Sequence, residues 1–186
     1  EWALQYFPSS GKVLDAGCGQ GQDTKLFAEK GYSVVAADFS ETALKFSEEK
    51  MPAELKPKIE YRRIDLSEPL PLEDSSFEVV YSHMASHYFD AAGPQRLFNE
   101  YFRVLKPGGV VVLLLNTVHD AEIAKGTKLE DHFYQIGDMK KRFFSAESVK
   151  AFASKFEVIL ADEEGETYKD RTIGNGRLVR LVARKG

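Results

Sequence analysis

The segment from Val13 to Asp23, which reads VLDAGCGQGQD, constrains the fold more than any other part of the chain. A short apolar run ends in Asp15, glycines follow at alternate positions, and an amphipathic helical pattern then begins. Glycine tolerates positive φ angles and lets a ligand approach the backbone where a Cβ atom would collide. The segment therefore predicts a strand-to-helix turn that binds a nucleotide.

The spacing of the glycines distinguishes two kinds of nucleotide site. A dinucleotide-binding turn reads G-x-G-x-x-G, with its third glycine at the position of Gln22, whereas this chain has Gly21 one residue earlier. The next apolar run, residues 33–38, ends in Asp38, close to where a ribose-binding acid is expected. A carboxylate there accepts hydrogen bonds from both ribose hydroxyls and repels a phosphorylated ribose, so NADP is disfavoured.

Together with two later motifs, the glycine turn resembles the class I S-adenosylmethionine-dependent methyltransferases. The acid followed by G-x-G-x-G looks like the first motif of that family, and Asp65-Leu66 looks like its adenine-recognition dipeptide. Residues 69–80 and 103–110 resemble its entries into the fourth and fifth strands. The resemblance implies S-adenosyl-L-methionine as the cofactor and S-adenosyl-L-homocysteine as the product.

The resemblance also implies roles for individual residues. Asp38 would bind the ribose, Asp65 would accept the exocyclic amine of adenine, and the Leu66 backbone would contact a ring nitrogen. The glycine turn would hold the methionine part, with its carboxylate near the helix that begins around Gln22, because free amides there favour an anion. The expected cofactor-binding residues are Asp15, Gly17, Cys18, Gly19, Gly21, Asp38, Phe39, Asp65, Leu66 and Ser82.

Apolar runs alternate with helical patterns along most of the chain, which is typical of a parallel sheet with helices on its faces. Strands are expected near residues 12–16, 33–38, 59–64, 77–82 and 109–115, and helices near 22–30, 40–50, 94–105 and 145–155. Two last strands, 157–161 and 178–183, are joined at Gly174-Asn175-Gly176 without a helix, so they must be antiparallel. The resemblance implies a three-layer, Rossmann-like α/β fold with a seven-stranded, mostly parallel sheet whose last strand is antiparallel.

The length of 186 residues and the ordinary apolar content fit a single domain spanning 1–186. No apolar run is long enough to cross a bilayer and no charged-then-apolar leader opens the sequence, so we expect a cytoplasmic protein without a membrane partner. The formal net charge is −4 and the basic residues are scattered among acids, which disfavours nucleic acid as a partner. The single cysteine, Cys18, is interpreted as a packing residue rather than a nucleophile. Nothing in the sequence points to an oligomeric state.

Methyl transfer from a sulfonium is an in-line displacement on an activated donor, so alignment and exclusion of water supply much of the catalysis. A base is needed only where the acceptor holds a proton at neutral pH. Within residues 82–90, His83 and His87 are four apart, would share a helical face if the segment coils, and are the candidate catalytic bases. The alternative for both is packing or hydrogen bonding. HxxxH without a third ligand predicts no metal site.

The expected acceptor is an oxygen, nitrogen or sulfur atom of a small molecule. The Asn/Asp-Pro-Pro-aromatic motif of amino-group methylation is missing after the fourth strand, as is the glutamate pair used on arginine. Methylation of a pyrimidine carbon needs a cysteine nucleophile, and Cys18 lies at the cofactor. Two alternatives stay open, namely methylation of a protein or RNA, and a regulatory module that binds the cofactor without catalysis.

Residues 116–144 form a long connection rich in histidine and aromatic residues, and loops of this length are commonly functional. We expect this segment to be a substrate-side insertion that forms much of the acceptor pocket and acts as a lid. The alternative is a short helix docked by its aromatic residues. Lys140, Arg142 and Arg171 are candidates to pair with an anionic acceptor, and the alternative for each is a solvated surface charge.

Overall fold

The computed structural model describes residues 2–86, 92–166 and 177–186. Its centre is a seven-stranded sheet with the strand order β3-β2-β1-β4-β5-β10-β9. The strands are β1 (Lys12–Ala16), β2 (Ser33–Asp38), β3 (Ile59–Arg63), β4 (Phe77–His83), β5 (Leu105–Asn116), β9 (Glu157–Gly165) and β10 (Leu178–Arg184). The pairs from β3 to β5 are parallel, and β10 is antiparallel to both of its neighbours, β5 and β9. The expected fold class is confirmed, and the Gly174-Asn175-Gly176 turn lies outside the described residues.

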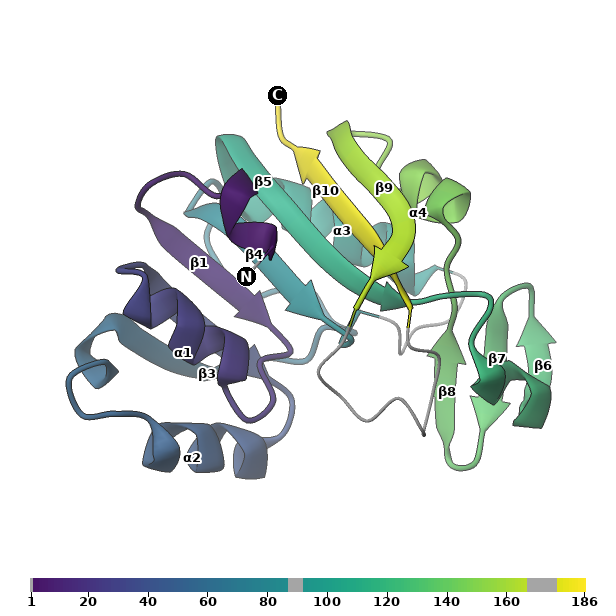
Figure 1. Ribbon diagram of the computed structural model, residues 1–186, viewed down its shortest axis with the longest axis horizontal. Helices are drawn as coiled ribbons and strands as arrows, with labels where there is room; N and C mark the ends of the chain where they lie inside the picture. Colours follow the sequence, from purple (N-terminus) through teal and green to yellow (C-terminus); the bar gives the residue numbers. More distant parts are fainter. Residues whose placement is uncertain (1, 87–91, 167–176) are drawn as a thin grey trace.

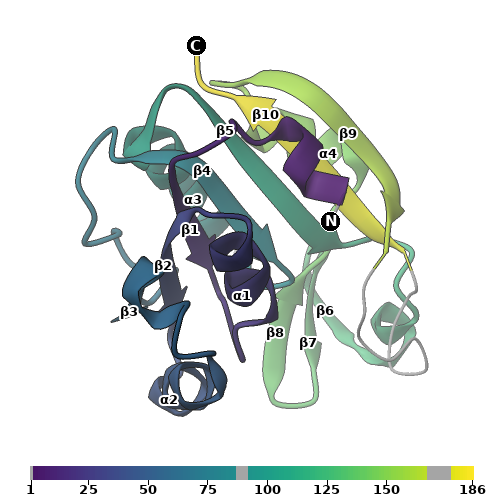
Figure 2. The same cartoon turned by 60° about the vertical axis from the view of Figure 1, so that its left-hand side comes forward.

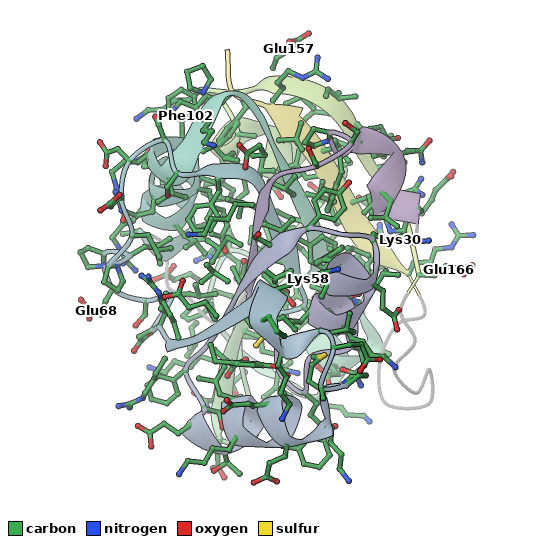
Figure 3. The ribbon with its side chains drawn as sticks, turned by 90° about the vertical axis from the view of Figure 1, so that its left-hand side faces the viewer. Lys30, Lys58, Glu68, Phe102, Glu157 and Glu166 are labelled. Atoms are coloured by element: carbon green, nitrogen blue, oxygen red, sulfur yellow. The ribbon has the colours of Figure 1, made fainter. Side chains whose placement is uncertain are left out.

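Helices cover both faces of this sheet (Figure 1). One face carries α1 (Gln22–Glu29), α2 (Glu41–Lys50) and the 3₁₀ helix η1 (Trp2–Tyr6), and the other carries α3 (Gly93–Val104) and α4 (Ala146–Phe152). Figure 3, seen from the β3 edge, shows Phe102 of α3 on one side of the sheet and Lys30 at the end of α1 on the other. The sheet therefore separates two cores, and the three layers follow from the alternation of side chains along each strand.

Strand β4 shows this alternation in its own side chains. Val79 and Tyr81 belong to the core beneath α1, where the Tyr81 ring packs edge-on against Phe27. Val80 belongs to the opposite core, together with Tyr101 of α3. Because the strand is buried on both faces, its centre from Val79 to Tyr81 is apolar without interruption.

The helix starts follow local capping chemistry. Ser40 accepts a hydrogen bond from the Ala43 amide at 3.2 Å and caps α2. Ser145 and Ser148 form a reciprocal capping box at the start of α4. A short 3₁₀ helix, η2 (Lys56–Lys58), precedes β3, and Lys58 donates to the Ala28 carbonyl near the end of α1.

Strand β5 begins earlier than the sequence predicts. The expected strand covers 109–115, but Leu105 already has extended backbone angles and pairs with Phe77 of β4. Helix α3 therefore ends at Val104, one residue before the end of the predicted range 94–105. The fully buried Leu105 side chain explains the difference, because it anchors the chain to the core directly after the helix.

The long connection after β5 forms a second, small sheet. It contains the 3₁₀ helix η3 (Ala121–Lys125) and the antiparallel strands β6 (Thr127–Glu130), β7 (Phe133–Ile136) and β8 (Met139–Arg142). Figures 1 and 2 both place this small sheet beyond the carboxyl end of β5. The connection is thus mainly paired strands rather than an open loop or a single docked helix, and the chain turns between β7 and β8 at Gly137, which has a φ of 57°.

Two basic residues of β8 are buried, and each forms an ion pair with a glutamate of the same segment. Lys141 Nζ lies 2.7 Å from Glu122 Oε2 on η3, and Arg142 Nη2 lies 3.0 Å from Glu130 Oε2 on β6. Arg142 is therefore not the solvated surface charge given as the alternative, because Glu130 of β6 pairs with it. Lys140 is exposed as that reading expects, and Arg171 lies outside the described residues.

Replacing Arg142 with alanine is expected to loosen the small sheet and leave the central sheet folded. Arg142→Ala leaves Glu130 and the Asp131 carbonyl without their donor, a loss of about 1–3 kcal/mol. Amide hydrogen exchange over 127–142 should accelerate and the melting temperature should fall. The control is Lys140→Ala, which alters an exposed residue of the same strand and should match the wild type. Unchanged exchange in Arg142→Ala would mean that the small sheet does not depend on this ion pair.

Candidate functional site

The glycine turn between β1 and α1 has the backbone that the sequence predicts. The φ angles are 81° at Gly17, 53° at Gly19 and 80° at Gly21. The Gly17 amide donates to the Ala37 carbonyl of β2 at 2.7 Å, which ties the turn to the sheet. A Cβ atom on Gly17 would lie 2.0 Å from the Ala85 Cβ, whereas one on Gly19 would have no atom within 4 Å. Glycine is thus needed at position 17 for space as well as conformation.

Asp38 joins the end of β2 to this turn. Its Oδ2 accepts a hydrogen bond from the Gly19 amide at 2.8 Å, and its Oδ1 accepts one from the Ser40 amide at 2.9 Å. The two bonds fix the orientation of the carboxylate, and each oxygen keeps a second acceptor position for a ligand. A fixed carboxylate with free acceptor positions has the chemistry needed to bind a diol.

A cavity of about 400 Å³ lies beside Asp38. Ser67 donates its amide to Asp65 Oδ1 at 2.8 Å, and hydrogen bonding from Ser67 holds the pKa of Asp65 below its ordinary value. The Phe39 ring is 60% exposed and lies 5.2 Å from the Arg63 guanidinium, which leaves aromatic surface available at the cavity. The lining residues are Gly17, Asp38, Phe39, Ile64, Asp65, Leu66, Ser67 and Ala85.

A second cavity of about 390 Å³ lies along the glycine turn and the start of α1. Gly17 borders both cavities, so the two adjoin at this residue. The amides at the start of α1 have no helical partners and favour an anion. The lining residues are Asp15, Gly17, Cys18, Gly19, Gln20, Gln22, Asp23 and His83.

The Asp15 carboxyl is buried at the floor of the second cavity, where only 2% of the residue is exposed. Thr24 donates its hydroxyl to Asp15 Oδ2 at 2.5 Å. Burial, followed by the neighbouring Asp23 carboxylate, raises the pKa of Asp15 to about 8. Asp15 is therefore mostly protonated at neutral pH, and a positively charged ligand beside it would favour its ionised form.

Cys18 is buried in the same turn, and burial raises the pKa of its thiol. A thiol that keeps its proton is a poor nucleophile, because the thiolate is the reactive form. This supports the interpretation of Cys18 as a packing residue. It packs in a small cluster with Ala36 and Leu44.

Two of the predicted site residues, Ser82 and His83, lie in strand β4. His83 ends strand β4 rather than lying on a helix, and His87 is outside the described residues, so the shared helical face is not found. His83 Nδ1 lies 3.1 Å from Asp23 Oδ2, and its Nε2 is shielded from solvent. The fully buried Ser82 hydroxyl bonds to Ser86 at 2.8 Å. The catalytic role of His83 and the cofactor contact of Ser82 stay predictions.

Sequence reasoning missed several residues that line the cavities. Ile64 precedes the predicted Asp65, and Asp23 ends the glycine segment, so neighbouring motifs contained a signal for both. No sequence motif indicates Ala85, because its contact with Gly17 depends on the turn that follows β4.

Comparison with known proteins assigns the chain to a family. Residues 14–113, more than half of the chain, match the family model described as "Methyltransferase domain". The chain therefore belongs to the class I S-adenosylmethionine-dependent methyltransferases, and S-adenosylmethionine is its cofactor.

The similar proteins differ in what their names say they methylate. A malonyl-[acyl-carrier protein] O-methyltransferase of Pectobacterium atrosepticum is 35% identical over 109 residues, covering 59% of this chain and 40% of that protein. Phosphoethanolamine N-methyltransferase 1 of Triticum aestivum is 28% identical over 160 residues, covering 84% of this chain and 32% of that protein. The chain thus spans less than half the length of these curated relatives.

A solved structure matches nearly the whole chain. The S-adenosylmethionine-dependent methyltransferase structure from Methanosarcina mazei superposes with a TM-score of 0.79 at 25% identity, covering 99% of this chain and 96% of that one. Among the described residues, no helix is both long and apolar enough to span a membrane.

Proposed function

We infer that this protein transfers the methyl group of S-adenosylmethionine to an oxygen, nitrogen or sulfur atom of a small molecule. The observation that carries this proposal is the pair of cavities that adjoin at Gly17. Asp38, Asp65 and Leu66 line the first cavity, which would bind the adenosine part of the cofactor. The glycine turn and the start of α1 line the second cavity, which would bind the methionine part. The sulfonium would then lie between the two cavities.

In the proposed reaction, an acceptor lone pair attacks the methyl carbon as the carbon–sulfur bond breaks, and S-adenosylhomocysteine leaves with the electron pair on sulfur. A proton on the acceptor passes to a base or to water. The protein aligns the donor and excludes water, which supplies much of the rate. His87 stays a proposed base. The Asp23 contact and buried Nε2 of His83 support a positioning role more than proton transfer.

We further propose that the chain is one domain in which residues 116–144 form the acceptor side of the site. The position of the small sheet beyond the carboxyl end of β5 supports this role, because ligands in open α/β sheets bind at the carboxyl ends of strands. The relatives named as O- and N-methyltransferases support oxygen or nitrogen as the acceptor atom. A cytoplasmic location stays a proposal from the sequence.

Calorimetric titration tests the function, with S-adenosylmethionine and S-adenosylhomocysteine as ligands and NAD as the control. Both methionine-derived ligands should bind and NAD should not. Folded protein that binds neither would contradict the proposal. Positive binding leads to a screen of small acceptors for methyl uptake, which should give stoichiometric S-adenosylhomocysteine.

A matched pair of glycine variants sharpens this test. Gly17→Ala places a Cβ 2.0 Å from that of Ala85, so it should abolish or strongly weaken S-adenosylmethionine binding. Gly19→Ala has a similar positive φ and no atom within 4 Å of the new Cβ, so it carries only backbone strain. If both variants lose the same S-adenosylmethionine affinity, the close contact between Gly17 and Ala85 does not matter for ligand binding.

A further inference from the structure

Three buried hydroxyls form a chain between β4 and α3. Ser82 Oγ lies 2.8 Å from Ser86 Oγ, which in turn lies 2.8 Å from Tyr101 Oη. The three residues are each at most 1% exposed. Burial raises the pKa of Tyr101 to about 12, so its hydroxyl keeps its proton and remains a donor.

A buried hydroxyl is costly unless it is hydrogen bonded, and replacing both bonded partners by apolar side chains of similar shape can leave the stability nearly unchanged. Satisfied polar networks in a core instead hold one geometry in preference to others. The geometry that this network fixes is the backbone that follows β4, because Ser86 is bonded on one side to the strand and on the other to the helix.

The fixed backbone forms part of the cofactor crevice. Met84 has a φ of 55°, in the left-handed region, and its amide donates to the Leu114 carbonyl at 2.9 Å. The next residue, Ala85, packs against Gly17 so closely that no Cβ fits there, and both line the first cavity. Gly17 also borders the second cavity, so this contact lies at the junction of the two.

We propose that the hydroxyls of Ser82, Ser86 and Tyr101 position Ala85 against Gly17 and thereby set the place where the adenosine and methionine parts of the cofactor meet. The inference rests on the proposed function. Tyr101 is a positioning residue, since it acts through Ser86 and Ala85 and lines neither cavity. The strained Met84 supports the assignment, because a left-handed non-glycine residue persists only where its surroundings hold it.

The test compares Tyr101→Phe and Ser86→Ala with Phe98→Leu in the full chain. Phe98 lies one turn before Tyr101 on α3, is equally buried, and has its ring centre 6.5 Å from that of Tyr101. For each variant, calorimetry gives the affinity for S-adenosylmethionine well below the melting temperature, and thermal unfolding gives the stability. Both hydroxyl deletions should weaken cofactor binding about fivefold or more. Phe98→Leu should lower the melting temperature and keep the wild-type affinity.

The proposal is overturned if both hydroxyl deletions bind S-adenosylmethionine like the wild type, or if Phe98→Leu weakens binding by the same factor. Where Tyr101→Phe fails to fold, Ser86→Ala decides the test alone, and wild-type affinity in that variant overturns the proposal. Failure of the proposed function gives a different result, since wild-type protein would then not bind S-adenosylmethionine at all.

Discussion

Asp38→Ala is expected to weaken the binding of S-adenosylmethionine about a hundredfold. The carboxylate is held by the amides of Gly19 and Ser40, so a ribose that donates both hydroxyls to it pays little for ordering the side chain. Two hydrogen bonds to a charged acceptor amount to roughly 3 kcal/mol, which corresponds to about a hundredfold in affinity. S-adenosylhomocysteine carries the same ribose, so its affinity should fall by the same factor in the same calorimetric titration.

The control for this variant is Glu41→Ala, which removes an exposed acid three residues further along the chain. Glu41 pairs with Arg63 at the surface, and an exposed pair contributes little. Its affinity for both ligands should match the wild type. Thermal unfolding checks that Asp38→Ala remains folded, because the substitution also removes the acceptor of the Gly19 amide. A folded Asp38→Ala protein with undiminished affinity would refute the assignment of this residue to the ribose.

The sequence was sufficient where function requires a particular residue in a local context. The three glycines at 17, 19 and 21 have the positive φ angles that their spacing predicts, and Asp38 ends its strand as expected. Asp65 and Leu66 line the first cavity together with Asp38. In each case the strand before the residue brings it to the carboxyl edge of the sheet, so local pattern and position coincide.

The sequence was insufficient where pairing over long distances decides the structure. The four residues of β6 are all exposed, so they carry no apolar alternation that marks a strand. The burial of Arg142 was not predicted, because its partner Glu130 lies on another strand of the small sheet. The contact between Ser86 and Tyr101 likewise depends on how α3 packs, and no motif records it.

The buried Asp15 carboxyl is expected to make the folded protein less stable as the pH rises from about 5 to about 8. Its pKa is about 8 in the folded state, against an ordinary value of 3.8 that applies when the chain is unfolded. Between these values the folded state binds the proton and the unfolded state releases it, so the free energy of unfolding decreases with increasing pH. Each unit of pKa difference corresponds to about 1.4 kcal/mol, so the full effect amounts to a few kcal/mol.

Other shifted carboxyls act in a different pH range. Hydrogen bonds and ion pairs lower the pKa of Asp65, Glu100 and Asp162, so their stabilising contributions are present above their unfolded pKa values and are lost only in acid. The interval from pH 5 to 8 therefore isolates Asp15 from them. The remaining titrating groups are the same in wild type and variant, and they cancel when the two unfolding curves are subtracted.

Asp15→Asn should remove most of this pH dependence, because the amide is neutral at every pH and its oxygen can still accept the Thr24 hydroxyl. Denaturant unfolding at pH 5, 6.5 and 8 should show the variant gaining stability relative to the wild type as the pH rises. Thr24→Val should act in the opposite direction, because the Thr24 hydrogen bond lowers the pKa of Asp15 and its loss disfavours the carboxylate further. Parallel pH profiles for wild type and Asp15→Asn would mean that Asp15 is already ionised throughout this range, and that the floor of the second cavity is permanently negative.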